Sequence, residues 1–279
     1  MRLHYGDPFR EQKLLVAGEA SCEGFPRFEI AGPERLSWLH AITAQDFARL
    51  QPHVPVSAYI LNYQGHIIHA LWGEDDGQVF HAQTEPGHEA DLLAWLGSMV
   101  FATKVEMRSA PVEPAAEKPP AGSWAYDALR IAAGTPRIFR DTDDRTLPNE
   151  LAMPDGDRLG ASVHLKKGCY PGQETVARVY NIGRPPRRLT RLLLDGSEDR
   201  LPDMGADVLL EGEIVGRMGT SAIHYELGPI GLALLKRDVP TGAALTVDGI
   251  AASQQVIVDP DVGLHFQAAQ AVGGKRWLL

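Results

Sequence analysis

The sequence predicts an α+β protein built from several lobes, and three observations support this fold class. Strand-like and helix-like patterns alternate in the N-terminal part, a proline-rich segment interrupts the chain at residues 109–123, and only short strand-like runs follow Leu189. With 279 residues, 44% of them hydrophobic, the chain is long enough for more than one core. We therefore expect an N-terminal α+β lobe at 1–110, a second α+β lobe at 111–185 and a C-terminal β lobe at 186–279.

The N-terminal lobe is predicted to contain an antiparallel sheet with two helices. Gly-Pro at 32–33 opens the first helix, and Leu92, Trp95, Leu96 and Met99 recur at helical spacing in the second, near 87–97. Turns with glycine separate the strands. The expected strands are FPRFEI, VSAYIL, HIIHALWG, QVFHAQ and FATKVEMRS.

The second lobe begins with a predicted helix at 124–133. Ser123 is expected to cap its N-terminus, and Gly134 with Pro136 marks its end. A second helix is predicted at 173–180. The C-terminal lobe has short strands separated by Gly, Pro and Asp, so that a small β-barrel or a sandwich fits it.

Composition narrows the classes of function. The net charge of −9 argues against general binding to nucleic acid or to an anionic membrane. The sequence contains neither the apolar core of a signal peptide nor a run that could span a membrane, so we expect a cytoplasmic protein without a membrane partner. The two cysteines, Cys22 and Cys169, are too few for a disulfide framework or a metal site of their own, and Cys22 is interpreted as a small buried hydrophobe.

Cys169 lies in the stretch HLKKGCYPGQETVARVYNIGRPP, just before the second helix of its lobe. The helix N-terminus and the neighbouring Lys166 and Lys167 would favour a reactive thiolate. A buried cysteine in a tight turn explains the same features equally well.

Glu174 and Arg178 also allow two interpretations. Their spacing suits an ordinary i,i+4 salt bridge on the helix. A carboxylate in the first helical turn could instead accept two parallel hydrogen bonds from a heterocycle such as a pterin.

The segment KGCYPGQE, Lys167 to Glu174, resembles the signature K-G-C-Y-x-G-Q-E of the YgfZ family. This family comprises folate-binding proteins that support iron-sulfur enzymes and are related to the aminomethyltransferase of the glycine cleavage system. LRIAAGTPRI, LPNEL and FEIAGPERLSWLHAITAQD also resemble segments of that superfamily. All seven fixed positions of the signature are present: Lys167, Gly168, Cys169, Tyr170, Gly172, Gln173 and Glu174.

The resemblance implies a three-lobed, aminomethyltransferase-like fold around a central folate site, with a C-terminal β-barrel. It implies tetrahydrofolate or a one-carbon derivative as the cofactor. Glu174 would meet the pterin ring, Tyr170 and Gln173 would line the site, and Cys169 would be the functional thiol. Arg130 matches an arginine that serves either structural pairing or folate contact.

The sequence departs from the aminomethyltransferases at the motif G-G-I-x-D-D. This chain has Gly65, His66, Ile67, Ile68, His69 and Ala70, so both aspartates are missing. His69 could line the folate pocket, and a neutral histidine could act as a base. On a regular strand His66 and His69 point to opposite faces, so no metal site is expected from them.

The leading hypothesis is a tetrahydrofolate-binding accessory protein for assembly or repair of iron-sulfur clusters in enzymes such as tRNA-modifying radical enzymes. Its expected partners are folate and iron-sulfur assembly factors or client enzymes, with no direct binding of nucleic acid. A folate-dependent one-carbon transferase or demethylase is the main alternative, and a thiol oxidoreductase that uses Cys169 is another. Whether there is any catalytic turnover is left open.

Overall fold

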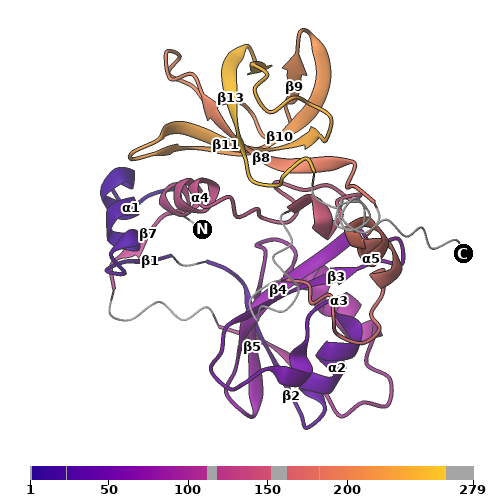
Figure 1. The fold of residues 1–279 in the computed structure, drawn as a ribbon. Helices are drawn as coiled ribbons and strands as arrows, with labels where there is room; N and C mark the ends of the chain where they lie inside the picture. The colour runs from indigo at the N-terminus through magenta and orange to yellow at the C-terminus, as the bar shows by residue number, and fades with distance from the viewer. Residues whose placement is uncertain (1, 23, 112–117, 152–161, 182, 262–279) are drawn as a thin grey trace, which may run out of the picture.

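The computed structural model describes residues 2–22, 24–111, 118–151, 162–181 and 183–261. Its strands form a five-stranded antiparallel sheet, a closed six-stranded barrel and a two-stranded parallel pair. In Figure 1 the barrel lies at the top, the five-stranded sheet with its helices lies at the bottom, and further helices lie between them on both sides. The predicted fold class, α+β with a C-terminal barrel, is confirmed, while the lobe boundaries stay a prediction.

The five-stranded sheet has the order β3-β4-β5-β2-β6. Two helices, α2 (Arg35–Ile42) and α3 (Glu89–Ser98), cover one of its faces. Alternate strand residues such as Phe28, Ile60 and Phe80 point to these helices and are fully buried, as the period of two requires. The strands are β2 (Arg27–Ala31), β3 (Val56–Leu61), β4 (Ile67–Asp75), β5 (Val79–Thr84) and β6 (Glu106–Ala110).

A β-bulge interrupts the pairing of β3 with β4. Leu61 pairs with Ile67 and Ile60 pairs with His69, which leaves Ile68 as an extra residue. The strict alternation expected for this strand is therefore wrong at this point. His69 shares the helix-covered face with Ile60, whereas Ala70 pairs with Tyr59 on the other face.

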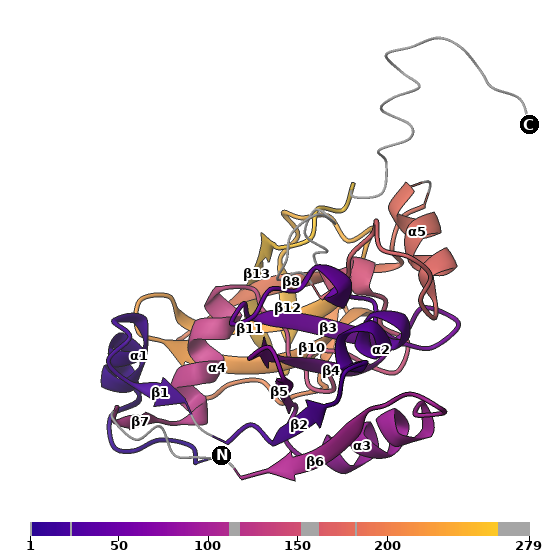
Figure 2. The same ribbon diagram turned by 90° about the horizontal axis from the view of Figure 1, so that it is seen from below.

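The N-terminal segment packs on the second lobe. Helix α1 (Pro8–Val16) contacts α4 (Ser123–Ala132), and β1 (Ser21–Cys22) pairs in parallel with β7 (Pro120–Ala121). Figure 2 shows α1, β1 and β7 next to α4. The sequence did not predict α1, which Asp7 caps by accepting hydrogen bonds from the backbone of residues 9 and 10.

The prediction that Ser123 caps the helix at 124–133 is wrong by one position. Gly122 is the N-cap, and Ser123 is the first helical residue. The N-terminal segment supplies the acceptors instead: the carbonyl of Arg2 accepts from the Ser123 backbone, and the carbonyl of Leu3 accepts from that of Trp124. A Cβ at position 122 would lie 2.2 Å from the Leu3 carbonyl oxygen, so this close approach requires glycine.

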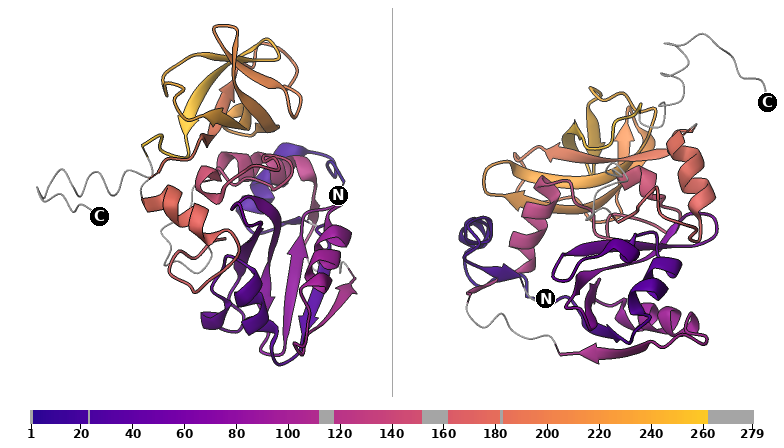
Figure 3. Two further views of the ribbon diagram at one scale, coloured as in Figure 1. Left: turned by 90° about the vertical axis from the view of Figure 1, so that its right-hand side faces the viewer. Right: turned by 60° about the horizontal axis from the view of Figure 1, so that its bottom comes forward.

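The barrel is closed in the order β10-β11-β8-β13-β12-β9. On β8, Leu192 and Leu194 point into the barrel core, while Leu189 packs outward against the core shared with the second lobe. Figure 3 shows the barrel above the rest of the molecule, with α5 (Gln173–Asn181) at its side. The barrel strands are β8 (Arg187–Leu194), β9 (Asp207–Leu210), β10 (Glu213–His224), β11 (Gly228–Lys236), β12 (Leu245–Val247) and β13 (Ile250–Val256).

Candidate functional site

The KGCYPGQE signature forms a loop that leads directly into α5. The helix begins at Gln173, as the sequence predicts. Just before it, Gly172 has φ +77°, and a Cβ there would lie 2.5 Å from the Asn62 carbonyl oxygen and 2.6 Å from the Gly65 Cα. The signature turn thus packs backbone to backbone on the β3–β4 turn, and only glycine fits at position 172.

Cys169 is a free, exposed cysteine. It lies in a surface depression next to Tyr63, a residue that is 88% exposed. The thiol therefore has the accessibility that a reactive cysteine needs, and the alternative of a buried turn cysteine does not describe it. The depression is lined by Ala41, Tyr63, Cys169, Tyr170, Pro171, Gly172, Gln173 and Glu174.

Glu174 lies on the same outer surface. It is in the first turn of α5, and both it and Arg178 are exposed. Gln173 lies beside it and is half-buried. A ligand that contacted the Glu174 carboxylate would be bound at the surface, where water screens the interaction, rather than in a desolvated pocket.

Tyr170 has the opposite environment. Its side chain is 7% exposed and packs with Val176 in the core shared by the three lobes. Burial raises the pKa of the Tyr170 phenol to about 12, so the hydroxyl is protonated at neutral pH. That hydroxyl is buried and has no hydrogen-bond partner among the described residues. A buried donor without a partner lowers the stability of the protein by about 1 to 3 kcal/mol, unless a ligand or water accepts its hydrogen bond.

Asn149 is a second buried polar residue near α5, and the sequence did not indicate it. It lies in a short 3-10 helix (Pro148–Leu151), where its Nδ2 donates to the Val176 carbonyl at 3.3 Å. Its Oδ1 is buried and has no partner within the described part of the chain. Asn149 Oδ1 and the Tyr170 hydroxyl are thus two buried polar groups that have no hydrogen-bond partner among the described residues.

His69 projects from the bulge in β4 toward α3. Its ring centroid lies 6.1 Å from that of Trp95 and 6.3 Å from that of Phe139. Burial lowers the pKa of His69 below its usual 6.5, with Asp91 opposing and His88 adding to the shift. The imidazole is thus neutral at pH 7, and its buried Nδ1 has no partner among the described residues. The bulge that places it here leaves no signal in the sequence.

Arg130 is part of a buried ion-pair network, and its guanidinium group is 4% exposed. It donates to Asp127 at 2.6 Å, to Asp141 at 2.7 Å, to the Thr135 carbonyl at 3.2 Å and to Thr220 Oγ1 at 2.6 Å. Of the two roles left open for Arg130, the structure shows structural pairing.

Lys167 is also directed inward, which differs from the expectation of a cation placed to activate the thiol. Its side chain is 6% exposed, and its ammonium group donates to the carbonyls of His40 and Thr43 at the end of α2. Gly168, by contrast, is exposed, and no atom lies within 4 Å of a Cβ built there.

The structure thus divides the predicted residues among separate places. Cys169, Gln173 and Glu174 line the outer depression, and Tyr170 lines it as well while packing into the inner core. His69 lies between β4 and α3, and Arg130 lies in the network between α4 and the barrel.

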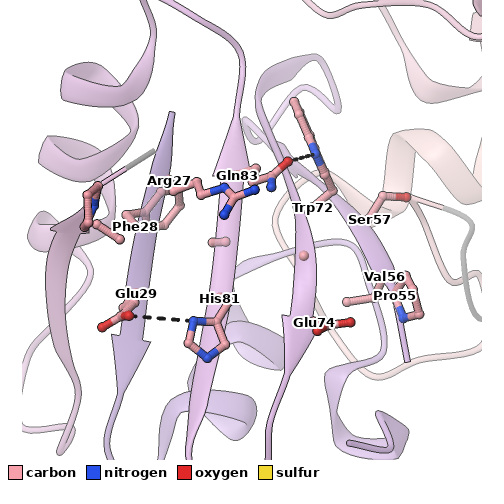
Figure 4. A pocket seen from close by; sticks show the side chains of 14 residues that line it. Arg27, Phe28, Glu29, Pro55, Val56, Ser57, Trp72, Glu74, His81 and Gln83 are labelled. Carbon is pink, nitrogen blue, oxygen red and sulfur yellow. Dashed lines mark hydrogen bonds and ion pairs between the residues drawn. The ribbon is translucent and has the colours of Figure 1, made fainter. Parts of the chain in front are cut away.

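A further cavity of about 710 Å³ lies on the open face of the five-stranded sheet. Figure 4 shows its side chains in cross-strand rows, with Trp72 donating to Gln83 in one row and Glu29 facing His81 in another. No motif in the sequence indicates this cavity. It is lined by Arg27, Phe28, Glu29, Pro55, Val56, Ser57, Trp72, Gly73, Glu74, His81, Ala82, Gln83, Ala110 and Pro111.

Among the described residues, no group of three or more His, Cys, Asp or Glu side chains is arranged to hold a metal ion. None of the helices in the described ranges has the length and apolar character needed to cross a membrane.

Comparison with known proteins supports the resemblance that the signature indicates. The chain is 34% identical over 157 residues to "tRNA-modifying protein YgfZ" of Edwardsiella ictaluri (strain 93-146), which covers 55% of the chain and 45% of that protein. It is 40% identical over 111 residues to the protein of the same name from Escherichia coli (strain SMS-3-5 / SECEC), which covers 39% of the chain and 32% of that protein. The chain therefore matches less than half the length of these curated relatives. No family model matches.

The fold itself is similar to that of a solved enzyme structure. The glycine cleavage system aminomethyltransferase T from Bartonella henselae superimposes with a TM-score of 0.71 at 16% identity, covering 91% of this chain and 90% of that one. The recognition made from KGCYPGQE is confirmed: this chain has an aminomethyltransferase-like fold and is similar in sequence to proteins named tRNA-modifying protein YgfZ.

Proposed function

We propose that this protein binds tetrahydrofolate, or a one-carbon derivative of it, and acts as an accessory factor in assembly or repair of iron-sulfur clusters. Its clients would include enzymes that modify tRNA. The observation that carries the proposal is that two buried polar atoms, Tyr170 Oη and Asn149 Oδ1, have no hydrogen-bond partner among the described residues of an aminomethyltransferase-like fold. The expected cytoplasmic location stays a prediction from the sequence.

The residues present fit a pterin ring. A pterin carries donors and acceptors along one edge of a flat heterocycle, and the unpaired phenol and amide oxygen would satisfy such groups in a dry site. His69, which is neutral and has no partner for Nδ1 among the described residues, lies apart from these two groups between β4 and α3. When bound, the folate would carry a one-carbon unit, while these side chains would orient the ring and exclude water.

An accessory role is favoured over one-carbon transfer because no carboxylate occupies the two positions that carry aspartates in aminomethyltransferases. His69 faces α3, and Ala70 lies on the opposite face of the sheet. The transferase alternative rests on His69, whose lowered pKa leaves it available as a neutral base.

Cys169 is the proposed point of contact with iron-sulfur partners, because its thiol is exposed beside an exposed aromatic side chain. A thiol oxidoreductase would need a resolving thiol from elsewhere. The other cysteine, Cys22, belongs to β1 and packs near Tyr126 rather than in the depression around Cys169.

The test is a calorimetric titration with tetrahydrofolate of the wild type, Tyr170→Phe and Tyr63→Phe. We expect Tyr170→Phe to weaken binding about tenfold, since one hydrogen bond in a desolvated site is lost. Tyr63→Phe removes the same hydroxyl from an exposed position and should bind as the wild type does.

Failure of the wild type to bind folate, or equal affinities for all three proteins, would reject the inner site. Formaldehyde and amine donors then distinguish the two functions. Binding without turnover supports an accessory protein, and turnover that is lost in His69→Ala supports the transferase.

A further inference from the structure

Lys167 is unusually buried for a lysine and is held by a helix end. Its ammonium group donates to the carbonyl oxygens of His40 and Thr43, the latter at 2.6 Å. His40 lies in the last turn of α2, and Thr43 is its C-cap. The carbonyls at a helix C-terminus carry partial negative charge, so a cation is stabilised there.

The loop around Lys167 forms an arch, which we define as residues 167–170. Its ends, Lys167 and Tyr170, are buried, while Gly168 and Cys169 between them are exposed. The two ends also contact each other, because the Lys167 Nζ lies 5.2 Å from the centroid of the Tyr170 ring. The thiol is therefore at the top of the arch, and a shift of either end would move it.

We infer that Lys167 is the positioning residue of the signature thiol: its amine, bound to the C-terminal carbonyls of α2, holds the arch and so determines where Cys169 stands. This role differs from activation of the thiol by a neighbouring charge, which Lys166 could supply as well. The inference rests on the proposed function, in which the Cys169 thiol on this arch contacts iron-sulfur partners.

The ionisable groups near the amine are His40 on α2, Asp46 after it, and His164 and Cys169 on the loop itself. Burial lowers the pKa of Lys167 from its usual 10.5 to about 8, against the opposing effects of Asp46 and Cys169. If the arch opens, the amine enters water and regains its usual pKa. In the pH range between these two pKa values, closing the arch onto the carbonyls of α2 therefore releases a proton. A rise in pH thus favours the closed arch.

The first test compares two lysines of equal charge. Backbone hydrogen exchange is measured at His164, whose amide donates to the Ala44 carbonyl at 2.8 Å, and at Lys167, whose amide donates to the His164 carbonyl. We expect Lys167→Met to lower protection at these two amides about tenfold or more, since the two hydrogen bonds to the carbonyls of His40 and Thr43 are lost. Lys166→Met removes the same charge from an exposed position and should change protection less than twofold. Unchanged exchange in β11 serves as the control that the fold is intact.

The second test needs no change at Lys167. In a Cys169→Ser background, which removes a second ionisable group beside the amine, protection corrected for intrinsic exchange should rise about tenfold from pH 7 to 9. Lys167→Met in that background should show no such rise. Protection that stays level or falls with pH in the protein with Lys167, or an equal effect of Lys166→Met and Lys167→Met, overturns the inference. Because no folate is present, this outcome is separate from the test of the proposed function.

Discussion

Arg130 on α4 donates a hydrogen bond of 2.6 Å to Thr220 on β10, and the same guanidinium binds Asp141 at 2.7 Å. The Thr220 hydroxyl and backbone N–H both donate to Asp141 in turn, at 2.6 and 2.7 Å. Helix α4 and the barrel are thus joined through a buried arginine that donates four hydrogen bonds to described residues. The side chain of Arg130 therefore ties the end of α4 to β10.

Arg130→Met is expected to lower the free energy of unfolding by about 3 to 5 kcal/mol, because the buried Asp141 carboxylate would lose its cationic partner. Urea denaturation measures this change. Arg140→Met is the matched control: Arg140 is exposed and lies 3.8 Å from Asp127, so its loss should cost less than about 1 kcal/mol. Similar values for the two variants would contradict the structural role of Arg130.

Substitution by alanine should change stability differently at two glycines of the signature. Gly172→Ala is expected to destabilise the protein by about 1 to 3 kcal/mol, since φ is positive there and the new Cβ would meet the backbone of Asn62 and Gly65. Gly168→Ala should change stability by no more than about 0.5 kcal/mol, because its Cβ position is open. Thermal unfolding of both variants tests the pair, and equal melting temperatures would show that the packing on the β3–β4 turn is not maintained.

Cys169→Ser should fold as the wild type does. The thiol is exposed, so replacing sulfur with oxygen should change stability by less than about 0.5 kcal/mol. We expect the variant to bind tetrahydrofolate normally and to fail in supporting iron-sulfur enzyme activity in cells. A destabilised variant that still supports that activity would make the cysteine a structural residue.

Glu174→Ala tests whether the ligand reaches the outer depression. Because Glu174 is exposed, folate bound at the inner site should show a change in affinity of less than about threefold. Calorimetric titration of Glu174→Ala and Tyr170→Phe with tetrahydrofolate measures the two changes in affinity. A loss of about 2 kcal/mol or more, as a buried carboxylate ligand would give, places the pterin at Glu174 instead.

Acid stability should depend on Asp143. Hydrogen bonds from Arg187 hold the pKa of Asp143 well below its usual range, in spite of partial burial. A carboxyl group with a lowered folded-state pKa stabilises the protein above its unfolded value near 3.9, and this contribution is lost as the pH falls below it.

Urea denaturation from pH 7 to pH 3 should therefore show a smaller loss of stability in Asp143→Asn than in the wild type. Asp207→Asn, an exposed substitution on β9, is the control and should follow the wild-type profile. Parallel profiles for all three proteins would show that the Arg187 contact does not contribute.

The local sequence pattern by itself determined much of the secondary structure of this protein. The strands of the N-terminal sheet, the helices at 35–42 and 173–181, and the all-β C-terminal part follow from periodicity and turn residues, which act between near neighbours in the chain. The signature KGCYPGQE also determined which proteins this chain resembles, and it placed Cys169 correctly just before a helix N-terminus.

Only the tertiary structure decided which groups the candidate residues contact. Because of the β-bulge at Ile68, His69 lies on the face of the sheet that α3 covers. Lys167 is buried because its ammonium group donates to carbonyls at the end of α2. The turn at Asn62 explains Gly172, and the first residues of the chain cap α4 in place of Ser123. Apart from the bulge, these contacts join segments distant in sequence, so their geometry depends on how those segments pack and cannot be predicted from the spacing of residues along the chain.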